Sequence, residues 1–152
     1  MTTTGPGARC STRRFEHGDL EVLEVDNGPL RLAFLPQVGG RLISLAVHGC
    51  EVLWRNPAWL TADLQPTRPH ARWPRPDGSM GSWVNVGGAK TWPAPQGWSG
   101  PGEWPGPPDE VLDAGRYAVE HRSLAGGAVQ VELTSDAEPR TCLLYTSDAA
   151  DE

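Results

Sequence analysis

Cysteine is scarce in this chain, and its scarcity excludes two classes of small protein. The 152 residues include three cysteines, without a CxxC pair and without a histidine at ligand spacing. A disulfide framework needs an even set of regularly spaced cysteines, and a structural zinc site needs paired cysteines or histidines. We therefore expect neither structural disulfides nor a metal site.

Long apolar runs and basic clusters are missing too. No stretch reaches membrane-spanning length, and residues 1–15 lack the apolar core of a secretory signal. The net charge is −6, and no segment is long and basic enough to favour nucleic acid or an anionic membrane surface. These absences predict a cytoplasmic protein that binds neither nucleic acid nor membrane, and they leave the oligomeric state open.

Helix signals are the third absence, since the chain shows neither an amphipathic helical pattern nor an internal repeat. Apolar residues instead alternate with polar or small ones in short segments bounded by Gly, Pro or Asn turns, as in antiparallel strands. Residues 1–18 are polar and aperiodic, so we expect them to be disordered. The sequence predicts an all-β fold with a meander and a later hairpin, whose strands cover residues 20–25, 30–35, 41–47, 51–54, 116–122 and 128–134.

Proline and tryptophan, in contrast, are abundant and concentrated in residues 56–109. This stretch contains eleven of the fifteen prolines and six of the seven tryptophans. So many prolines exclude both helices and long strands. An irregular segment of this length in a compact domain is expected to cover a pocket or a sheet edge.

Residues 83–104 (WVNVGGAKTWPAPQGWSGPGEW) indicate what such a pocket binds. A sugar ring has an apolar C–H face and a rim of hydroxyl groups, so flat indole faces beside amide and ammonium donors suit it. Lys90 is the only lysine among thirteen basic residues, which favours a role for its compact ammonium group. The candidate residues for binding a small-molecule sugar are Lys90, Trp92, Gln96, Trp98, Arg41 and Asn85.

Other roles for three of these residues stay open. Lys90 is also compatible with an ordinary surface position. Asn85 is compatible with a hydrogen bond that fixes the loop backbone, and Arg41 with a solvated strand end.

No catalytic residue is assigned. The four histidines have no carboxylate at a readable spacing, and we expect them at the surface or in turns. The Asp109-Glu110 pair follows two prolines and is expected to be a solvated turn. Three further tryptophans are expected to pack in the interior: Trp54, Trp59 and Trp73.

Two motifs resemble the galactose-mutarotase-like superfamily, which contains the aldose 1-epimerases. The string GGRLISL (39–45) followed by GCEVLW (49–54) resembles its opening strands. The pattern W-x-N-x-G-G-x-K-x-W-P-A-P-Q (83–96) more specifically resembles an uncharacterised bacterial family within that superfamily. The resemblance covers about residues 20–135.

This resemblance implies an antiparallel β-supersandwich whose concave sheet holds a sugar. In the epimerases a histidine protonates the ring oxygen and a glutamate removes the anomeric hydroxyl proton, without a metal or organic cofactor. In that family both groups lie farther along the chain than this sequence extends. Their roles are therefore not transferred to any residue here, and enzyme activity stays open.

The last eleven residues, 142–152 (CLLYTSDAADE), resemble the in-frame translation of a transposase-type sequencing adapter. We therefore expect a non-native tail that contributes nothing to the fold. The domain prediction is a disordered segment 1–18, a partial β-sandwich 19–141 with the long loop 56–109, and the tail. A truncated sandwich is expected to be inactive and to have unpaired strand edges.

Together these features predict a carbohydrate-recognising protein, with sugar mutarotation as the activity of the full-length form. One alternative is a non-catalytic sugar-binding or structural sandwich. Another is a Trp/Pro-rich protein-interaction module whose polyproline II ridges bind an aromatic groove. The alternating strands on both sides of the segment argue against an autonomous linear motif.

Overall fold

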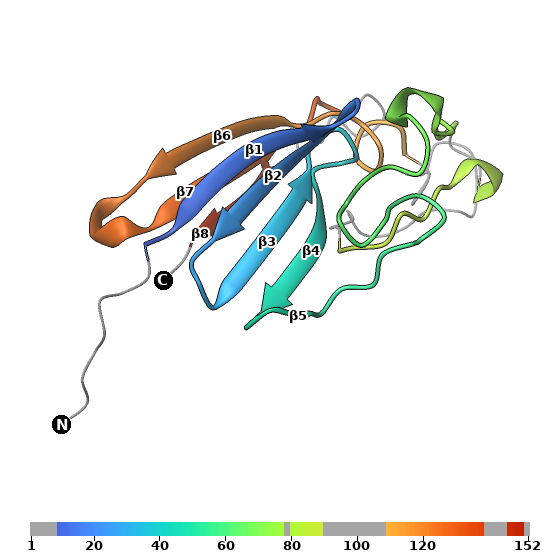
Figure 1. Cartoon of the computed structure of the whole chain (residues 1–152). Coiled ribbons are helices and arrows are strands. Elements are labelled where there is room, and N and C mark those ends of the chain that lie inside the picture. The colour runs from blue at the N-terminus through green and yellow to red at the C-terminus, as the bar shows by residue number, and fades with distance from the viewer. Residues whose placement is uncertain (1–8, 78–79, 90–108, 139–145, 151–152) are drawn as a thin grey trace.

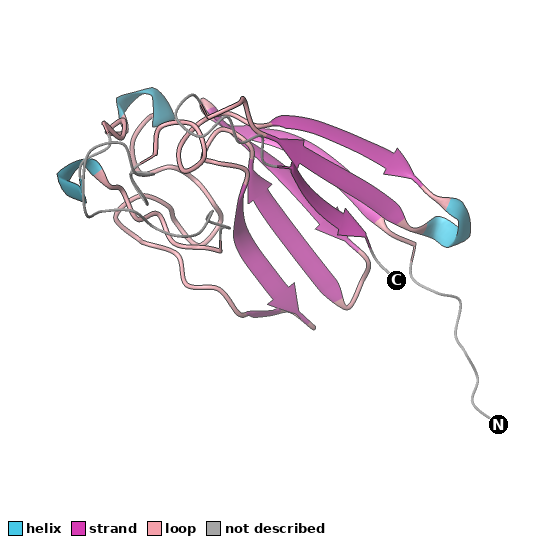
Figure 2. Cartoon of the chain, turned by 180° about the vertical axis from the view of Figure 1, so that it is seen from behind, coloured by secondary structure: helices cyan, strands magenta, loops and turns pink. Residues whose placement is uncertain are grey.

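The computed structural model describes residues 9–77, 80–89, 109–138 and 146–150 and contains two antiparallel sheets (Figures 1 and 2). Its described elements are strands and short 3₁₀ turns, so the all-β prediction is confirmed. Within those ranges no helix has the length and apolar character that crossing a bilayer requires. The strands are β1 (Ser11–His17), β2 (Leu20–Asp26), β3 (Leu30–Leu35), β4 (Arg41–Val47), β5 (Cys50–Glu51), β6 (Ala118–Ser123), β7 (Val129–Thr134) and β8 (Thr146–Ala150); the turns are η1 (His70–Arg72), η2 (Met80–Ser82) and η3 (Ala125–Gly127).

The first sheet is a meander in which β1 to β5 each pair antiparallel with the next strand. Its β2–β3 turn shows why the chain reverses where the sequence predicts. The Asp26 carboxylate accepts a hydrogen bond from the Gly28 backbone N–H (2.6 Å), and the Asn27 side-chain carbonyl accepts one from the Leu30 N–H (2.9 Å). Side-chain acceptors of this kind stabilise tight turns, so the local sequence is sufficient to reverse the chain here.

The second sheet has the order β6-β7-β8. Its first two strands are the predicted hairpin, which is confirmed. On β7 the buried residues Val129, Val131 and Leu133 alternate with half-buried ones. This period of two gives β7 one apolar face, and that face packs on the first sheet.

The first sheet is covered on both faces, which gives the molecule three layers. On β2, Leu23 and Val25 pack with the apolar face of β7, whereas Leu20 and Val22 point the other way. The second face is covered by loop residues, whose segments (green to yellow) gather beside β4 in Figure 1. The loop residues in this cluster are Leu60, Leu64, Trp73 and Val86, with Trp59 and Val84 packed against it. The described part of the proline-rich stretch, residues 56–77 and 80–89, therefore covers a sheet face and forms part of the core.

Two predicted boundaries are wrong. Residues 1–18 are predicted to be disordered, but residues 11–17 form β1 along β2. The predicted strand 51–54 is limited to β5, which ends at Glu51. The Glu51 carboxylate accepts hydrogen bonds from the backbone N–H groups of Leu45 on β4 (3.0 Å) and of Leu53 (3.1 Å), so one side chain holds β4 and the turn that follows β5.

The C-terminal tail also differs from expectation. The sequence predicts that residues 142–152 contribute nothing to the fold, yet β8 lies within this range and pairs with β7. That prediction is wrong, because without β8 the strand β7 would be an edge strand, whose backbone hydrogen-bonding groups an added strand of almost any composition can pair with. The resemblance of the tail to an adapter remains a prediction.

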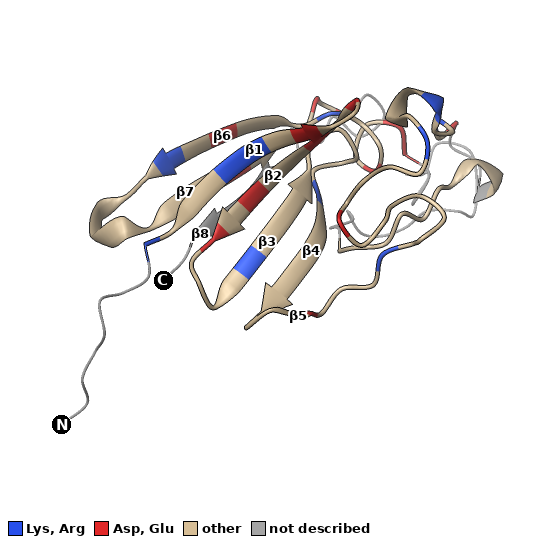
Figure 3. Cartoon of the chain, viewed as in Figure 1, with Lys and Arg blue, Asp and Glu red and all other residues tan. Residues whose placement is uncertain are grey.

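Basic and acidic positions lie on the neighbouring strands β1 and β2 of the first sheet (Figure 3), where their side chains form cross-strand pairs. Arg13 on β1 lies opposite Glu24 on β2 and forms an ion pair with it. Glu21 on β2 accepts hydrogen bonds from Arg14 on β1 and from Arg116 (2.6 Å), which precedes β6. One carboxylate therefore links the first sheet to the chain that enters the second.

Candidate binding site

The tryptophan-rich segment 90–108 is preceded by residues that are fixed against the first sheet. The Gly88 N–H donates to the Trp54 carbonyl (2.8 Å), and the Ala89 N–H donates to the Leu42 carbonyl of β4 (2.8 Å). Gly88 has a φ of 74°, and a Cβ at this position would lie 2.4 Å from the Leu42 carbonyl oxygen. Only glycine fits such a close approach, so the Gly-Gly pair of the motif has a structural function.

The residues that follow the segment are fixed as well. The Asp109 carboxylate accepts hydrogen bonds from the backbone N–H groups of Val111 (2.8 Å) and Leu112 (2.5 Å). The sequence predicts a solvated Asp109-Glu110 turn, and this is wrong for Asp109, which is 4% exposed. Its carboxylate replaces water as the acceptor for the N–H groups of the turn.

Arg41 connects the two ends. Its Nη1 donates to the Gly87 carbonyl (3.0 Å), and its Nη2 donates to the Asp113 Oδ1 (2.6 Å). We call this arrangement of Arg41, Gly87 and Asp113 the Arg41 clamp. Residues 88–112 are therefore an excursion whose two ends meet at one guanidinium group.

The clamp is buried, which determines its electrostatics. The side chains of Arg41 and Asp113 are both 3% exposed. Burial lowers the pKa of Arg41 to about 10, so the guanidinium is still charged at neutral pH. A buried charge is tolerated when an opposite charge pairs with it, and Asp113 supplies that charge. The predicted alternative of a solvated strand end is wrong for Arg41.

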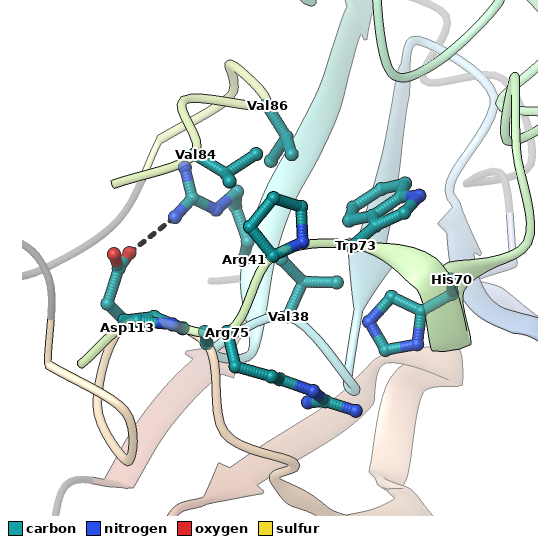
Figure 4. A pocket seen from close by; sticks show the side chains of 11 residues that line it. Val38, Arg41, His70, Trp73, Arg75, Val84, Val86 and Asp113 are labelled. Carbon is teal, nitrogen blue, oxygen red and sulfur yellow. Dashed lines mark hydrogen bonds and ion pairs between the residues drawn. The ribbon is translucent and has the colours of Figure 1, made fainter. Parts of the chain in front are cut away.

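A small cavity lies beside the clamp (Figure 4). Its polar lining consists of Arg41, Asp113, His70 and Arg75. Its volume is about 30 Å³, and about 10–15 Å³ is enough for one water molecule. The described walls therefore enclose room for small polar groups and not for a whole sugar ring. The apolar lining includes Val38, Trp73, Val84 and Val86.

One donor in this wall has no acceptor. The Arg41 Nε–H is buried and lacks a hydrogen-bond partner in the described part of the chain. A buried donor left unsatisfied costs about 1–3 kcal/mol. An oxygen atom within hydrogen-bond reach of Nε, from water or from a ligand, would remove that cost.

Hydrogen bonds to the backbone hold His70 beside the cavity. The Asp19 carboxylate accepts hydrogen bonds from the N–H groups of His70 (2.8 Å) and Ala71 (2.7 Å), which ties η1 to the β1–β2 turn. Burial and the nearby charge of Arg75 lower the pKa of His70, whereas Asp19 opposes them more weakly. The imidazole is therefore neutral at pH 7 and able to donate and accept hydrogen bonds.

The tryptophans near this site divide into packed and exposed ones. The Trp73 ring lies edge-on to the rings of His70 and Trp59, with centroid distances of 5.1 and 5.4 Å. Trp59 and Trp73 therefore pack as predicted. Trp54 is 60% exposed, so its predicted packing role is wrong. The Trp54 backbone carbonyl accepts the hydrogen bond from the Gly88 N–H, whereas the Trp54 indole lies at the surface.

The predicted sugar-binding residues have different outcomes. Arg41 lines the cavity, and Asn85 is exposed. The Asn85 side-chain carbonyl accepts a hydrogen bond from the Gly87 N–H (3.0 Å), which is the loop-fixing alternative. Asn85 therefore binds the N–H group and Arg41 the carbonyl group of the same residue, Gly87. Four of the candidates lie outside the described residues: Lys90, Trp92, Gln96 and Trp98.

Three residues of the site were not identified from the sequence. Asp113 and Arg75 have no assigned role there, and His70 is expected only as a surface or turn residue; it lies in the turn η1. Asp113 is 72 positions from Arg41, so no local spacing reveals the pair. One local signal exists, since a carboxylate in the apolar run Val-Leu-Asp-Ala (111–114) needs a buried partner.

Comparison with known proteins adds no further identification. The chain matches no protein-family model, no curated protein and no solved structure. The resemblance to the galactose-mutarotase-like superfamily therefore remains a prediction.

Proposed function

We propose that this chain recognises a carbohydrate through the segment that begins after Ala89. The Arg41 clamp is the observation that carries the proposal. Because Gly87 and Asp113 are held by one buried guanidinium, residues 88–112 are an excursion closed at its base. Loops that are fixed at both ends on a rigid scaffold are typical binding elements, and this loop includes the Lys90, Trp92, Gln96 and Trp98 pattern that suits a sugar.

The fold supports a more specific proposal about the fold family and the activity. Two antiparallel sheets that pack face to face are compatible with the N-terminal part of a galactose-mutarotase-like supersandwich. On this proposal the full-length protein is an aldose-1-epimerase-type isomerase. The proposal assigns no catalytic acid or base to a described residue, because none of them forms the histidine–glutamate arrangement of the epimerases.

Calorimetric titration of the 152-residue chain with glucose and galactose tests the proposal. We expect saturable binding to at least one of the two sugars. Lys90→Ala and Trp92→Ala should each weaken it by about tenfold, the equivalent of one lost charged hydrogen bond or one lost stacking contact. Arg72→Gln, an exposed change on η1, is the control and should leave the affinity unchanged.

The same titration separates the proposal from its alternatives. If both sugars fail to bind, or if binding survives both loop variants, sugar recognition by this segment is wrong and the protein-interaction module gains support. Mutarotation is tested separately, by following the optical rotation of a freshly dissolved α anomer with the full-length protein. An epimerase accelerates the change, whereas a binding protein leaves it at the spontaneous rate.

A further inference from the structure

We propose that the segment around η1, residues 68–75, is a docking surface for a short acidic stretch of a partner protein. The segment includes three exposed arginines, Arg68, Arg72 and Arg75, which we call the η1 arginines. Figure 3 shows basic positions along the loop that contains η1. This surface lies outside the sugar-binding segment proposed above, which begins after Ala89, so the two functions are independent.

The η1 arginines have no carboxylate partner, which distinguishes them from the arginines of the first sheet. There, Arg13 pairs with Glu24 and Arg31 pairs with Asp26. Among the described residues, no ion pair includes an η1 arginine. A guanidinium group presents its N–H donors as a planar fork that matches the two oxygens of a carboxylate. Three such forks on one short segment are therefore open to carboxylates from another molecule.

Acidic groups of the segment and its contacts do not outweigh this positive charge. Residues 68–77 include three arginines and one acidic residue, Asp77. Asp19 contacts the segment, but its two carboxylate oxygens accept the backbone N–H groups of His70 (2.8 Å) and Ala71 (2.7 Å). The unpaired guanidinium groups therefore favour a negatively charged partner.

The backbone beneath the η1 arginines is held in place. Three prolines in residues 69–76 restrict its φ angles. Trp73 is buried, and its indole N–H donates to the Arg68 carbonyl (3.1 Å). The Arg68 guanidinium carbon lies 4.8 Å from the centroid of the Trp59 ring, in a cation–π contact. A scaffold fixed in this way loses less conformational entropy when a partner binds.

The charge of the whole chain restricts the length of the partner's acidic stretch. The net charge is −6, so an extended polyanion such as nucleic acid would continue from the η1 arginines onto a molecule that repels it. A peptide with a few successive carboxylates can bind within the segment alone. A short acidic stretch of a protein is therefore the partner that fits this surface.

Fluorescence anisotropy with labelled peptides tests this surface on the 152-residue chain. The probes are hexaglutamate, neutral hexaglutamine and an oligothymidylate. The test variant is the double replacement Arg72→Gln and Arg75→Gln. The control is Arg13→Gln with Arg122→Gln, which removes the same two charges from exposed positions on β1 and β6.

We expect hexaglutamate to bind about tenfold more tightly than hexaglutamine and to bind more weakly as salt is added. The test variant should weaken hexaglutamate binding by about tenfold, as for two exposed ion pairs, and the control by less than about twofold. Arg72→Lys with Arg75→Lys keeps both charges and should restore most of the affinity.

Four results would overturn the assignment. Hexaglutamate that binds no more tightly than hexaglutamine, or an equal loss in the test variant and its control, would show that the η1 arginines do not form a docking surface. A lysine variant as weak as the glutamine variant would exclude charge attraction. Tighter binding of oligothymidylate would assign the surface to nucleic acid. A dimer in sedimentation that the test variant abolishes would assign it to a second copy of this chain.

Discussion

Arg41 is the residue whose replacement should affect the fold most, because it holds two distant segments with one buried charge. Arg41→Met removes the donor to Gly87 and leaves the Asp113 carboxylate without its guanidinium partner. We expect the free energy of unfolding to fall by about 3–5 kcal/mol, the usual effect of breaking a buried pair from one side. Urea denaturation measures it.

A double variant is the control for this prediction. Arg41→Met combined with Asp113→Leu removes both charges, so it should be more stable than Arg41→Met alone. A loss of less than about 1 kcal/mol in the single variant would mean that the clamp does not hold the loop base.

Gly39, in the turn before β4, tests how closely this turn approaches the backbone of Asp113 in the Arg41 clamp. Its φ is 67°, and a Cβ there would lie 2.3 Å from the Asp113 carbonyl oxygen. Gly18 has a similar φ of 64° with nothing within 4 Å of its Cβ position, so it is a matched control. We expect Gly18→Ala to cost about 1–2 kcal/mol from backbone strain alone.

Gly39→Ala should cost about 2 kcal/mol more than the control, because the backbone must also move apart. Thermal unfolding of both variants gives the comparison. Equal losses would show that Gly39 and Asp113 are not in close contact.

Among the strands, β1 and β2 depend on charge pairs, and this predicts a pH effect. Burial raises the pKa of Glu21, but the hydrogen bonds and charges of Arg14 and Arg116 outweigh it, so the pKa lies below its ordinary value of 4.5. A carboxyl group whose pKa is lowered by folding stabilises the protein above its unfolded pKa. This stabilisation is lost as the pH falls below 4.5 toward the folded pKa.

Glu21→Gln isolates this effect. The variant should be less stable than the wild type at pH 7 by about 1 kcal/mol, and the difference should shrink as the pH is lowered from about 5 to 3. Urea midpoints at several pH values measure it. A difference that stays constant with pH would show that Glu21 is not the titrating group.

The strands differ in how well the sequence predicts them, for physical reasons. β2, β3, β4, β6 and β7 follow from alternation and local turn signals. β1 has a single large apolar residue, Phe15, and its pairing depends on β2 through backbone bonds and pairs such as Arg13–Glu24. Its partners on β2 are close in sequence, because only Gly18-Asp19 separates the two strands, but the polar residues around Phe15 lack the alternation of apolar residues that identifies a strand.

The three-layer arrangement of the molecule makes a loop part of the core. Leu60 lies in the proline-rich stretch, yet it is 1% exposed and packs on the first sheet. Leu60→Ala should therefore lower the free energy of unfolding by about 2–5 kcal/mol, as in a regular core. The control is Leu124→Ala, since Leu124 is 40% exposed, and its effect should stay within about 0.5 kcal/mol.

Differential scanning calorimetry of both leucine variants makes the comparison. Similar melting temperatures for the two would contradict a loop layer that is packed as core.

The same layering explains why the site was only partly predictable. The residue types of the Trp/Pro segment are visible in the sequence, whereas the Arg41–Asp113 pair and the cavity exist only after four separate segments meet.

Saturation-transfer difference NMR tests carbohydrate recognition most directly. The sample contains the 152-residue chain and a large excess of glucose or galactose, and the protein methyl protons are irradiated. We predict saturation of the sugar C–H protons, strongest on one face of the ring as expected for stacking on an indole, and its loss in Trp92→Ala. Sugar spectra without any transfer, or transfer that Trp92→Ala leaves unchanged, would contradict the account.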